Sequence, residues 1–160
     1  MRLRRLERKD APLMLEWMHD DNVTEHMHKD FKSKTINDCI SFIECNDSNN
    51  IHRAIADDFD QYMGTVSLKK ISSNDAEFGI AIRECAMGKG YSQYGMKEML
   101  EIGFKDYSLK SVYWCVDIDN KRALRFYDKQ GYKRVNPNVL NIEGYSREEI
   151  QNFVWYITYR

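Results

Sequence analysis

The chain has 160 residues, and its 24 basic and 25 acidic side chains leave a formal net charge of −1 at pH 7. No block of Lys and Arg stands out, which argues against nucleic-acid or membrane-surface binding. No apolar run approaches the roughly 20 residues of a membrane-spanning helix, and Met1 leads into basic residues rather than a signal sequence. These features predict one domain over residues 1–160, located in the cytoplasm, with no nucleic-acid or membrane partner.

The cysteines predict neither a metal site nor a disulfide framework, because no C-x-x-C spacing occurs. No Asp, Glu or His spacing resembles a metal site either, so no metal is expected. We expect mainly buried, reduced thiols. The four cysteines are Cys39, Cys45, Cys85 and Cys115.

The first quarter of the chain predicts a strand followed by two helices. Residues 2–7 read as a short strand. Asp10 then resembles a helix N-cap, with Pro12 in the first turn. Thr35 begins a capping box that Asp38 completes, and apolar residues recur after it at helical spacing.

From Asn50 the apolar pattern changes to a period of two, which is typical of strands. Three alternating runs cover residues 51–56, 62–68 and 76–82. Turn-forming residues separate the runs, so they predict an antiparallel meander.

The second half predicts alternating helices and strands. A strand over 112–116 precedes a helix over 120–130, which Gly131 ends at the C′ position. The segment 136–151 has little periodicity, and 153–159 reads as a closing strand whose aromatic residues belong to the core. Those aromatic residues are Trp155, Tyr156 and Tyr159. A central helix precedes the strand over 112–116. Its apolar face is made of Met96, Met99, Leu100, Gly103, Phe104 and Tyr107.

The element order is therefore β-α-α-β-β-β-α-β-α-β-β. This order predicts an α/β (α+β) fold with a mixed, twisted sheet of about seven strands, antiparallel at first and covered by helices on both faces.

A glycine-rich turn lies between the third meander strand and the central helix. Such a turn suits an anion, because free N–H groups and the helix dipole point at the bound charge. The Walker pattern is absent, and the dinucleotide pattern fails because Gln93 stands where its last glycine belongs. Taken alone, the turn is equally explained by the need of glycine for a positive φ.

Residues 120–132 read N-K-R-A-L-R-F-Y-D-K-Q-G-Y. With the glycine turn and the element order, this stretch resembles the GNAT N-acetyltransferase superfamily, and the resemblance covers essentially the whole chain. The family patterns are Q/R-x-x-G-x-G/A at the turn and N-x-x-A-x-x-F-Y-x-K-x-G-F/Y downstream. The chain departs from the first pattern at Met87 and Ser92.

The resemblance implies acetyl-CoA as co-substrate, threaded through a gap between the fourth and fifth strands of a GNAT-like fold. The backbone of Ile80, Ala81 and Ile82 would pair with the pantetheine arm, and Asn120 would hydrogen-bond near it. Backbone N–H groups of the turn would wrap the pyrophosphate. The turn residues are Met87, Gly88, Lys89, Gly90, Tyr91 and Ser92.

Two residues are candidates for proton transfer. By its place in the family pattern, Tyr127 would protonate the departing CoA thiolate. Glu77 is the best-placed acid to take a proton from the attacking ammonium, although alternation puts it opposite Ile80 unless the strand has a bulge. A histidine, His26 or His28, or water is the alternative base.

The predicted activity is acetyl transfer from acetyl-CoA to a primary amine of a small molecule. The opening Asp10-Ala11 with Glu16-Trp17 resembles the ribosomal-protein and amino-sugar branches. We favour a small amine over a protein N-terminus, with an amino-sugar nucleotide as one candidate. A protein N-terminus and a non-catalytic acyl-CoA-binding module are the alternatives. The segments 20–34 and 136–151 are expected to select the acceptor, in a monomer or homodimer.

Overall fold

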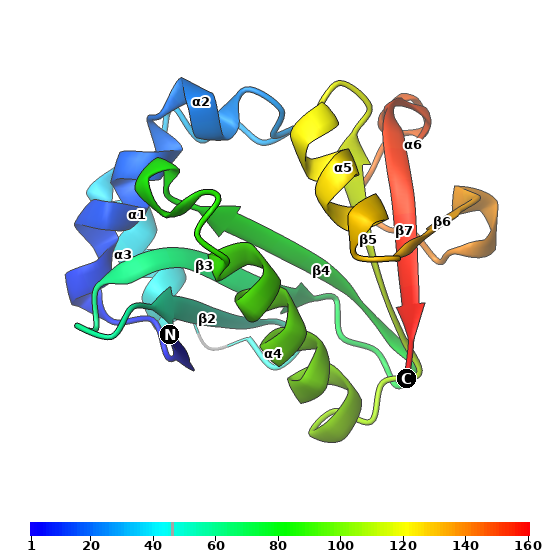
Figure 1. The fold of residues 1–160 in the computed structure, drawn as a ribbon, viewed down its shortest axis with the longest axis horizontal. Helices are drawn as coiled ribbons and strands as arrows, with labels where there is room; N and C mark the ends of the chain where they lie inside the picture. The colour runs from blue at the N-terminus through cyan, green and yellow to red at the C-terminus, as the bar shows by residue number, and fades with distance from the viewer. Residues whose placement is uncertain (46) are drawn as a thin grey trace.

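The computed structural model describes residues 1–45 and 47–160 and is built around one seven-stranded mixed sheet (Figure 1). The strand order is β1-β2-β3-β4-β5-β7-β6, and every neighbouring pair is antiparallel except β4 and β5. The strands are β1 (Arg2–Arg4), β2 (Ile51–Ala56), β3 (Tyr62–Lys69), β4 (Asp75–Ile82), β5 (Ser111–Asp117), β6 (Lys133–Val135) and β7 (Phe153–Tyr159).

The helices follow the expected order, with two short additions, α2 and α6. The helices are α1 (Ala11–Met18), α2 (Asp21–Thr24), α3 (Ile36–Glu44), α4 (Tyr91–Lys105), α5 (Lys121–Lys129) and α6 (Arg147–Asn152). Single 3₁₀ turns lie at Arg8–Asp10, Glu84–Ala86 and Pro137–Val139. The predicted α/β fold with helices on both faces is therefore confirmed.

The two faces of the sheet carry separate apolar cores. On one face, α4 and α5 pack on the strands through side chains such as Met99 and Leu124. On the other face, α1 and α3 pack on β2 and β3, with Trp17 and Cys39 buried. We call these the α4 face and the α1 face (Figure 1).

Local signals explain where several helices begin and end. The predicted capping box forms at α3, where Thr35 Oγ1 accepts from the Asp38 N–H and the Asp38 carboxylate accepts from the Thr35 N–H. Gly131 follows α5 with a φ of 81°, as its predicted C′ position requires. Asp10 occupies the N-cap position of α1, but its carboxylate does not cap that helix.

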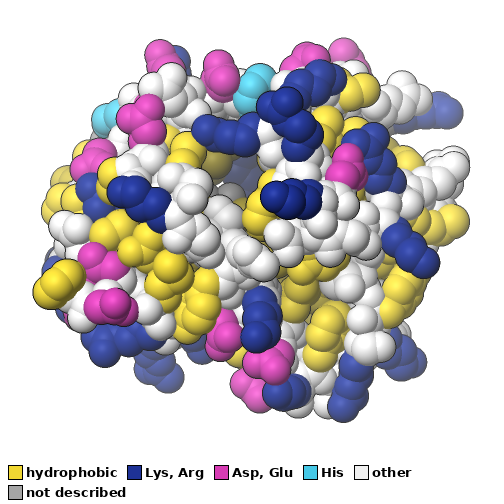
Figure 2. All heavy atoms as spheres, in the orientation of Figure 1, with side chains coloured by type: hydrophobic (Ala, Val, Ile, Leu, Met, Phe, Trp, Pro, Cys, Tyr) yellow, Lys and Arg dark blue, Asp and Glu magenta, His cyan; other side chains and the backbone are white. Residues whose placement is uncertain are grey.

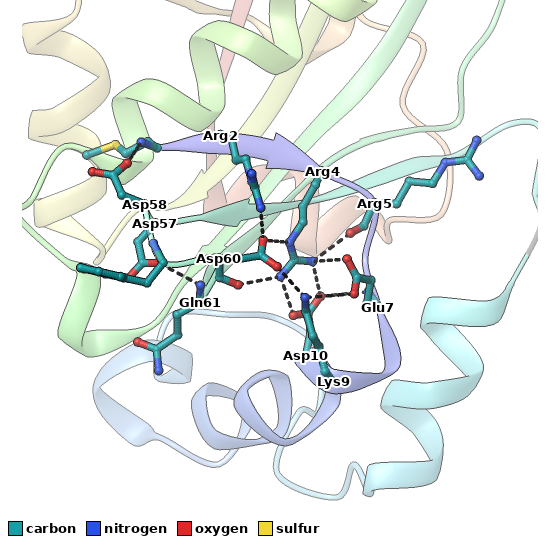
Figure 3. A network of polar contacts seen from close by, with 12 residues as sticks. Arg2, Arg4, Arg5, Glu7, Lys9, Asp10, Asp57, Asp58, Asp60 and Gln61 are labelled. Carbon is teal, nitrogen blue, oxygen red and sulfur yellow. Dashed lines mark hydrogen bonds and ion pairs between the residues drawn. The ribbon is translucent and has the colours of Figure 1, made fainter.

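Asp10 instead belongs to a charged network that joins β1 to the β2–β3 turn (Figure 3). Arg4 donates to both Asp10 oxygens, at 2.7 and 2.8 Å, and to Asp60 Oδ1 at 2.7 Å. Arg2 and Lys9 also donate to Asp60. The network stabilises the edge strand, whose three residues alone bury little surface.

Three smaller expectations are wrong. Tyr107 lies beyond the end of α4 and is exposed rather than part of its apolar face. Tyr159 is 67% exposed because it ends β7, whereas Trp155 and Tyr156 are buried as predicted. Cys45 and Cys85 are exposed; all four thiols are free.

Within the described residues, no helix is long and apolar enough to cross a membrane.

Candidate active site

The site begins where β4 and β5 separate. The two strands pair in parallel only from Asp75 to Glu77 on β4 and from Ser111 to Tyr113 on β5. Beyond this branch point, β4 continues along β3 and β5 continues along β7. The facing edges past the branch point therefore have backbone groups available to a ligand, as the predicted gap requires.

At the open end of the gap lies a hollow of about 440 Å³. Figure 2 shows the surface hollowed between α2 and α5, with Lys and Arg side chains at the rim. The hollow joins the end of α2 to both the β4–α4 connection and the start of α5. Its lining residues are Asn22, Glu25, His26, Glu84, Asp119, Asn120, Lys121 and Arg122.

The glycine turn has the backbone expected of an anion cradle. Gly88 and Gly90 have φ values of 73° and 86°, which glycine adopts without strain. Gly90 is the N-cap of α4 and provides no capping side chain. The first backbone hydrogen bond of the helix is from Tyr94 N–H to Gly90 C=O, so the N–H groups of residues 91–93 remain available.

The predicted cradle from Met87 to Ser92 needs one correction. The Met87 N–H already donates to Glu84 C=O at 3.0 Å, and the Lys89 N–H donates to Ala86 C=O at 3.4 Å. These two bonds close the 3₁₀ turn that leads into the cradle. The N–H groups of Gly88 and Gly90 and those at the start of α4 therefore remain available to a phosphate.

Asn120 lines the hollow at the start of α5, and Glu84 of the β4–α4 connection lines it too. Its Oδ1 accepts from the Ala123 N–H at 3.1 Å, so the side chain caps the helix. The residue is half-buried and lines the hollow. The cap uses Oδ1, which leaves the side-chain N–H₂ donors for a carbonyl ligand.

Tyr127 packs on the α4 face at the branch point. Its ring lies 5.3 Å from that of Trp114, the first β5 residue past the paired segment. Burial raises the pKa of the Tyr127 phenol well above 10, so the hydroxyl keeps its proton at neutral pH. Among the described residues, Trp114 Nε1 is the one fully buried side-chain nitrogen or oxygen atom without a hydrogen-bond partner. Tyr127 is 6% exposed, and its hydroxyl has no hydrogen-bond partner among the described residues.

Glu77 lies on the opposite, α1 face. β4 pairs with β3 in unbroken register from Lys69↔Glu77 to Gly64↔Ile82, so no bulge alters the alternation. Glu77 therefore shares its face with Ala81, which packs in the core under α1. This is the orientation that strict alternation predicts.

The Glu77 carboxylate is 2% exposed and tightly bound by its neighbours. Lys69 Nζ is 2.9 Å from Oε1, Lys70 Nζ is 2.8 Å from Oε2, and the Tyr145 hydroxyl donates to Oε1. Burial raises the pKa of Glu77, but these positive and donating groups outweigh burial and lower it to about 2. The carboxylate is thus ionised at neutral pH and holds a proton weakly.

The two candidate histidines lie in different places. His26 lines the hollow and is 3.2 Å from Glu25. The His28 ring is on the α1 face, 5.2 Å from the ring of Tyr145. Burial, and then the charge of Lys29, lower the pKa of His28 below 6.5, so its imidazole is neutral at pH 7.

Sequence reasoning missed three of the groups around Glu77. Lys69 could have been found, because the hairpin turn at Ser72–Asp75 sets it directly opposite Glu77. Lys70, one residue further, follows from the same hairpin. Tyr145 lies in the aperiodic segment before α6. No sequence pattern there indicates its contact with Glu77, which is 68 positions away.

In the part of the chain that the structure describes, no group of three or more His, Cys, Asp or Glu residues is placed to hold a metal ion.

The chain is similar to solved structures of acetyltransferases over nearly its whole length. A spermidine N-acetyltransferase from Vibrio cholerae in complex with CoA and spermine has a TM-score of 0.80 at 20% identity, covering 99% of this chain and 94% of that one. A GNAT-family acetyltransferase from Bacillus anthracis has a TM-score of 0.75 at 21% identity, covering 98% of this chain and 93% of that one. At these identities the likeness establishes the fold.

A search of curated protein sequences found no significant match. The family model described as "Acetyltransferase (GNAT) domain" matches residues 1–133. This match covers β4 and β5, which separate at the branch point, the glycine turn, and α5 with Asn120 and Tyr127. The chain therefore belongs to the GNAT acetyltransferase family, and acetyl-CoA is its co-substrate.

Proposed function

We propose that this protein transfers the acetyl group of acetyl-CoA directly to a primary amine of a small molecule. One observation supports this most strongly: Tyr127 and Glu77 lie on opposite faces of the sheet at the same branch point. A thioester threaded through the gap would expose one side of its carbonyl to each face. The amine could then attack from the α1 face while the sulfur leaves on the α4 face.

The proposed path of the co-substrate follows the free backbone groups. The pantetheine amides pair with the open edge of β4 at Ile80, Ala81 and Ile82, where Ile80 and Ala81 are half-exposed. The pyrophosphate sits on the N–H groups that begin α4, where the helix dipole favours negative charge. Lys121 and Arg122 at the rim of the hollow supply further positive charge.

The chemical step is addition to the thioester followed by loss of the thiolate. The amine arrives as an ammonium and must lose one proton before its lone pair attacks the carbonyl carbon. The C–S bond then breaks, the electron pair goes to sulfur, and Tyr127 donates its hydrogen bond or proton to that sulfur. The nitrogen of the adduct loses its second proton to water as the amide forms, and water reprotonates Tyr127 where its proton has been transferred. Because a simple thiol has a pKa near 8.5, stabilising the thiolate makes it a better leaving group.

Glu77 is a weak proton acceptor at a pKa of about 2, so we assign the proton of the amine to His28 or to water, with Glu77 supplying a fixed negative charge. The ammonium groups near Glu77 also favour the neutral form of a bound amine, which is the form that attacks. This division of roles replaces the simpler expectation of Glu77 as the base.

Three classes of amine are candidates for the acceptor. The Vibrio cholerae enzyme is a spermidine N-acetyltransferase solved with spermine, which makes polyamines one candidate class. Amino-sugar nucleotides and protein N-termini are the others. We also propose a cytoplasmic protein that acts as a monomer or homodimer without nucleic acid or membrane, consistent with its net charge of −1.

Isothermal titration with acetyl-CoA, followed by a thiol-release assay over amino sugars, polyamines and peptides, tests the proposal. Binding with acceptor-dependent release of CoA supports it. Binding without release for every acceptor would instead identify a non-catalytic acyl-CoA-binding module.

A further inference from the structure

The inner end of the gap between β4 and β5 is lined by aromatic rings on the α4 face. Phe78 follows Glu77 on β4 and Trp114 follows Tyr113 on β5, so Phe78 and Trp114 flank the branch point. Their ring centroids lie 5.9 Å apart in an edge-on arrangement. The Tyr127 ring of α5 lies 5.3 Å from the Trp114 ring. A thioester that reaches the branch point through the gap would therefore meet Trp114 beside Tyr127.

The indole N–H of Trp114 differs from those of the other two tryptophans in the chain. Trp17 Nε1 donates to the Tyr62 hydroxyl at 2.9 Å, and Trp155 Nε1 donates to the Ile150 carbonyl at 3.0 Å. Trp114 is 1% exposed, yet its Nε1 has no hydrogen-bond partner among the described residues. Buried polar groups in folded proteins are nearly always paired. This donor therefore has its hydrogen bond to give to a ligand.

The rings around Trp114 offer its N–H only a weak acceptor. Tyr156 stacks on the indole, with centroids 5.6 Å apart and planes at 7°, and its hydroxyl donates to Asp128. The Tyr132 ring meets the indole edge-on, at 5.0 Å and 88°. Contacts between an N–H and an aromatic face are weak, whereas hydrogen bonds to an ionised acceptor are strong. The sulfur of a departing thiolate is such an acceptor.

We infer that Trp114 is a further catalytic residue, whose indole N–H donates a hydrogen bond to the sulfur of the departing CoA beside Tyr127. The inference rests on the proposed function, because it adds a second donor to the same leaving group. When the C–S bond breaks, its electron pair goes to sulfur, Tyr127 gives that sulfur its proton or hydrogen bond, and the indole keeps its own proton throughout.

The Trp114 hydrogen bond would act mainly on the transition state. It strengthens as negative charge collects on sulfur, so it stabilises the departing thiolate more than the intact thioester. The surrounding rings seal Nε1 from water, so they must shift as the thioester enters. The contact should therefore form only when the sulfur is in place.

Indole ¹⁵N–¹H spectra of the wild-type protein test the contact without relying on turnover. The chain has 3 tryptophans, and single substitutions by Phe assign the three signals. At about pH 9, where a simple thiol is largely ionised, the Trp114 signal should move further downfield with CoA than with desulfo-CoA, which lacks only the sulfur. The signals of Trp17 and Trp155 are the internal references. Any other result for Trp114 overturns the inference, and a signal that neither ligand moves assigns the N–H to the Tyr132 ring.

Trp114→Phe keeps an aromatic ring but removes the N–H. Single-turnover acetyl transfer should slow about tenfold or more, the usual factor for a hydrogen bond to a charged group, while the dissociation constant of acetyl-CoA stays near that of the wild type. Trp17→Phe is the matched control, because it removes a paired indole N–H on the α1 face, and it should leave the rate near that of the wild type. Equal rates for Trp114→Phe and wild type overturn the inference.

The two measurements keep the possible failures apart. If Trp114→Phe does not fold, the wild-type spectra with CoA and desulfo-CoA still decide whether the indole contacts sulfur. Failure of the proposed function is separate, because no acceptor would then release CoA from a protein that binds acetyl-CoA.

Discussion

Lys69 lies directly opposite Glu77 in the antiparallel ladder of β3 and β4, and its ammonium is 2.9 Å from the Glu77 carboxylate. The pair sits at the last position where β4 still bonds to β5. The ion pair therefore stands at the branch point through which the acyl group is proposed to pass. The charge state of Glu77 decides whether its carboxylate can accept a proton from a bound amine.

Glu77→Gln should lower kcat/KM, because the neutral amide no longer holds the Lys69 and Lys70 ammonium groups in place, and the factor should be similar at every pH between about 5.5 and 9. The reason is the pKa of Glu77, which is lowered to about 2, so the wild-type carboxylate is ionised throughout that range. Its negative charge is lost only as the pH falls towards 2. Thiol-release rates across the range measure the effect.

Glu143→Gln is the control, because Glu143 reaches this cluster through its carbonyl rather than its side chain. If the ratio of wild-type to Glu77→Gln activity changes tenfold across the range, Glu77 titrates there and is the general base after all. An acid limb below pH 6.5 that persists in Glu77→Gln and disappears in His28→Gln assigns the base to His28, whose pKa is lowered from 6.5.

Tyr127→Phe should slow single-turnover acetyl transfer about a hundredfold, since losing a general acid costs about 10²–10⁴ in rate. A hydroxyl used for a neutral hydrogen bond would cost only about fivefold. The affinity for acetyl-CoA should stay near that of the wild type, because the ring still packs on Trp114. Rapid-quench measurement avoids masking by product release.

Tyr132→Phe is the matched control for Tyr127→Phe. It removes a hydroxyl from a ring in the same cluster, 5.0 Å from the Trp114 ring, and should have little effect. A Tyr127→Phe rate within threefold of wild type, roughly the scale of a lost neutral hydrogen bond, would leave Tyr127 as a packing residue.

Gly88→Asp should weaken acetyl-CoA binding about tenfold more than Gly88→Asn, the expected scale for a carboxylate near a pyrophosphate in a partly screened site. Both side chains tolerate the φ of 73° at Gly88 better than other residues. An added Cβ there has no neighbour within 4 Å, so both variants should fold. Calorimetric dissociation constants for CoA that agree between the variants would place the pyrophosphate elsewhere.

Arg4→Met should destabilise the fold by about 2 to 3 kcal/mol, because it leaves the Asp10 carboxylate, which is 2% exposed, without its ion-pair partner. Arg2→Met serves as the control, since Arg2 is 60% exposed in its pair with Asp60, and its effect should be much smaller. Urea unfolding at neutral pH measures both. Equal midpoints for Arg4→Met and wild type would mean that the network in Figure 3 does not stabilise β1.

Local patterns predicted those features that depend on near neighbours in the chain. Thr35 and Asp38 satisfy each other's backbone within one helical turn, and Gly131 supplies the positive φ that ends α5. Alternation also placed Glu77 on the correct face, because β4 has no bulge in its register with β3. The role of Asp10 was not predicted, because its carboxylate binds Arg4, six residues earlier on β1, instead of capping its own helix.

The candidate site divides in the same way. The glycine turn and the motif from Asn120 to Tyr127 each lie within one strand-to-helix junction or one helix, and both could be recognised as sequence. The groups that lower the pKa of Glu77 could not all be recognised, since Tyr145 reaches it across 68 positions. An aperiodic loop carries no repeating pattern from which such a contact can be inferred.

By itself, the sequence determined the periods of the strands and helices, the turn that leaves N–H groups free, and the motif that resembles the family. These depend on backbone hydrogen bonds and on side chains within a few residues of each other. Only the tertiary structure decided that β4 and β5 separate after Glu77, that Tyr127 and Glu77 take opposite faces, and that Lys69, Lys70 and Tyr145 meet around Glu77. Such features depend on how the sheet closes in space, because residues far apart in the chain meet only when every intervening element is packed.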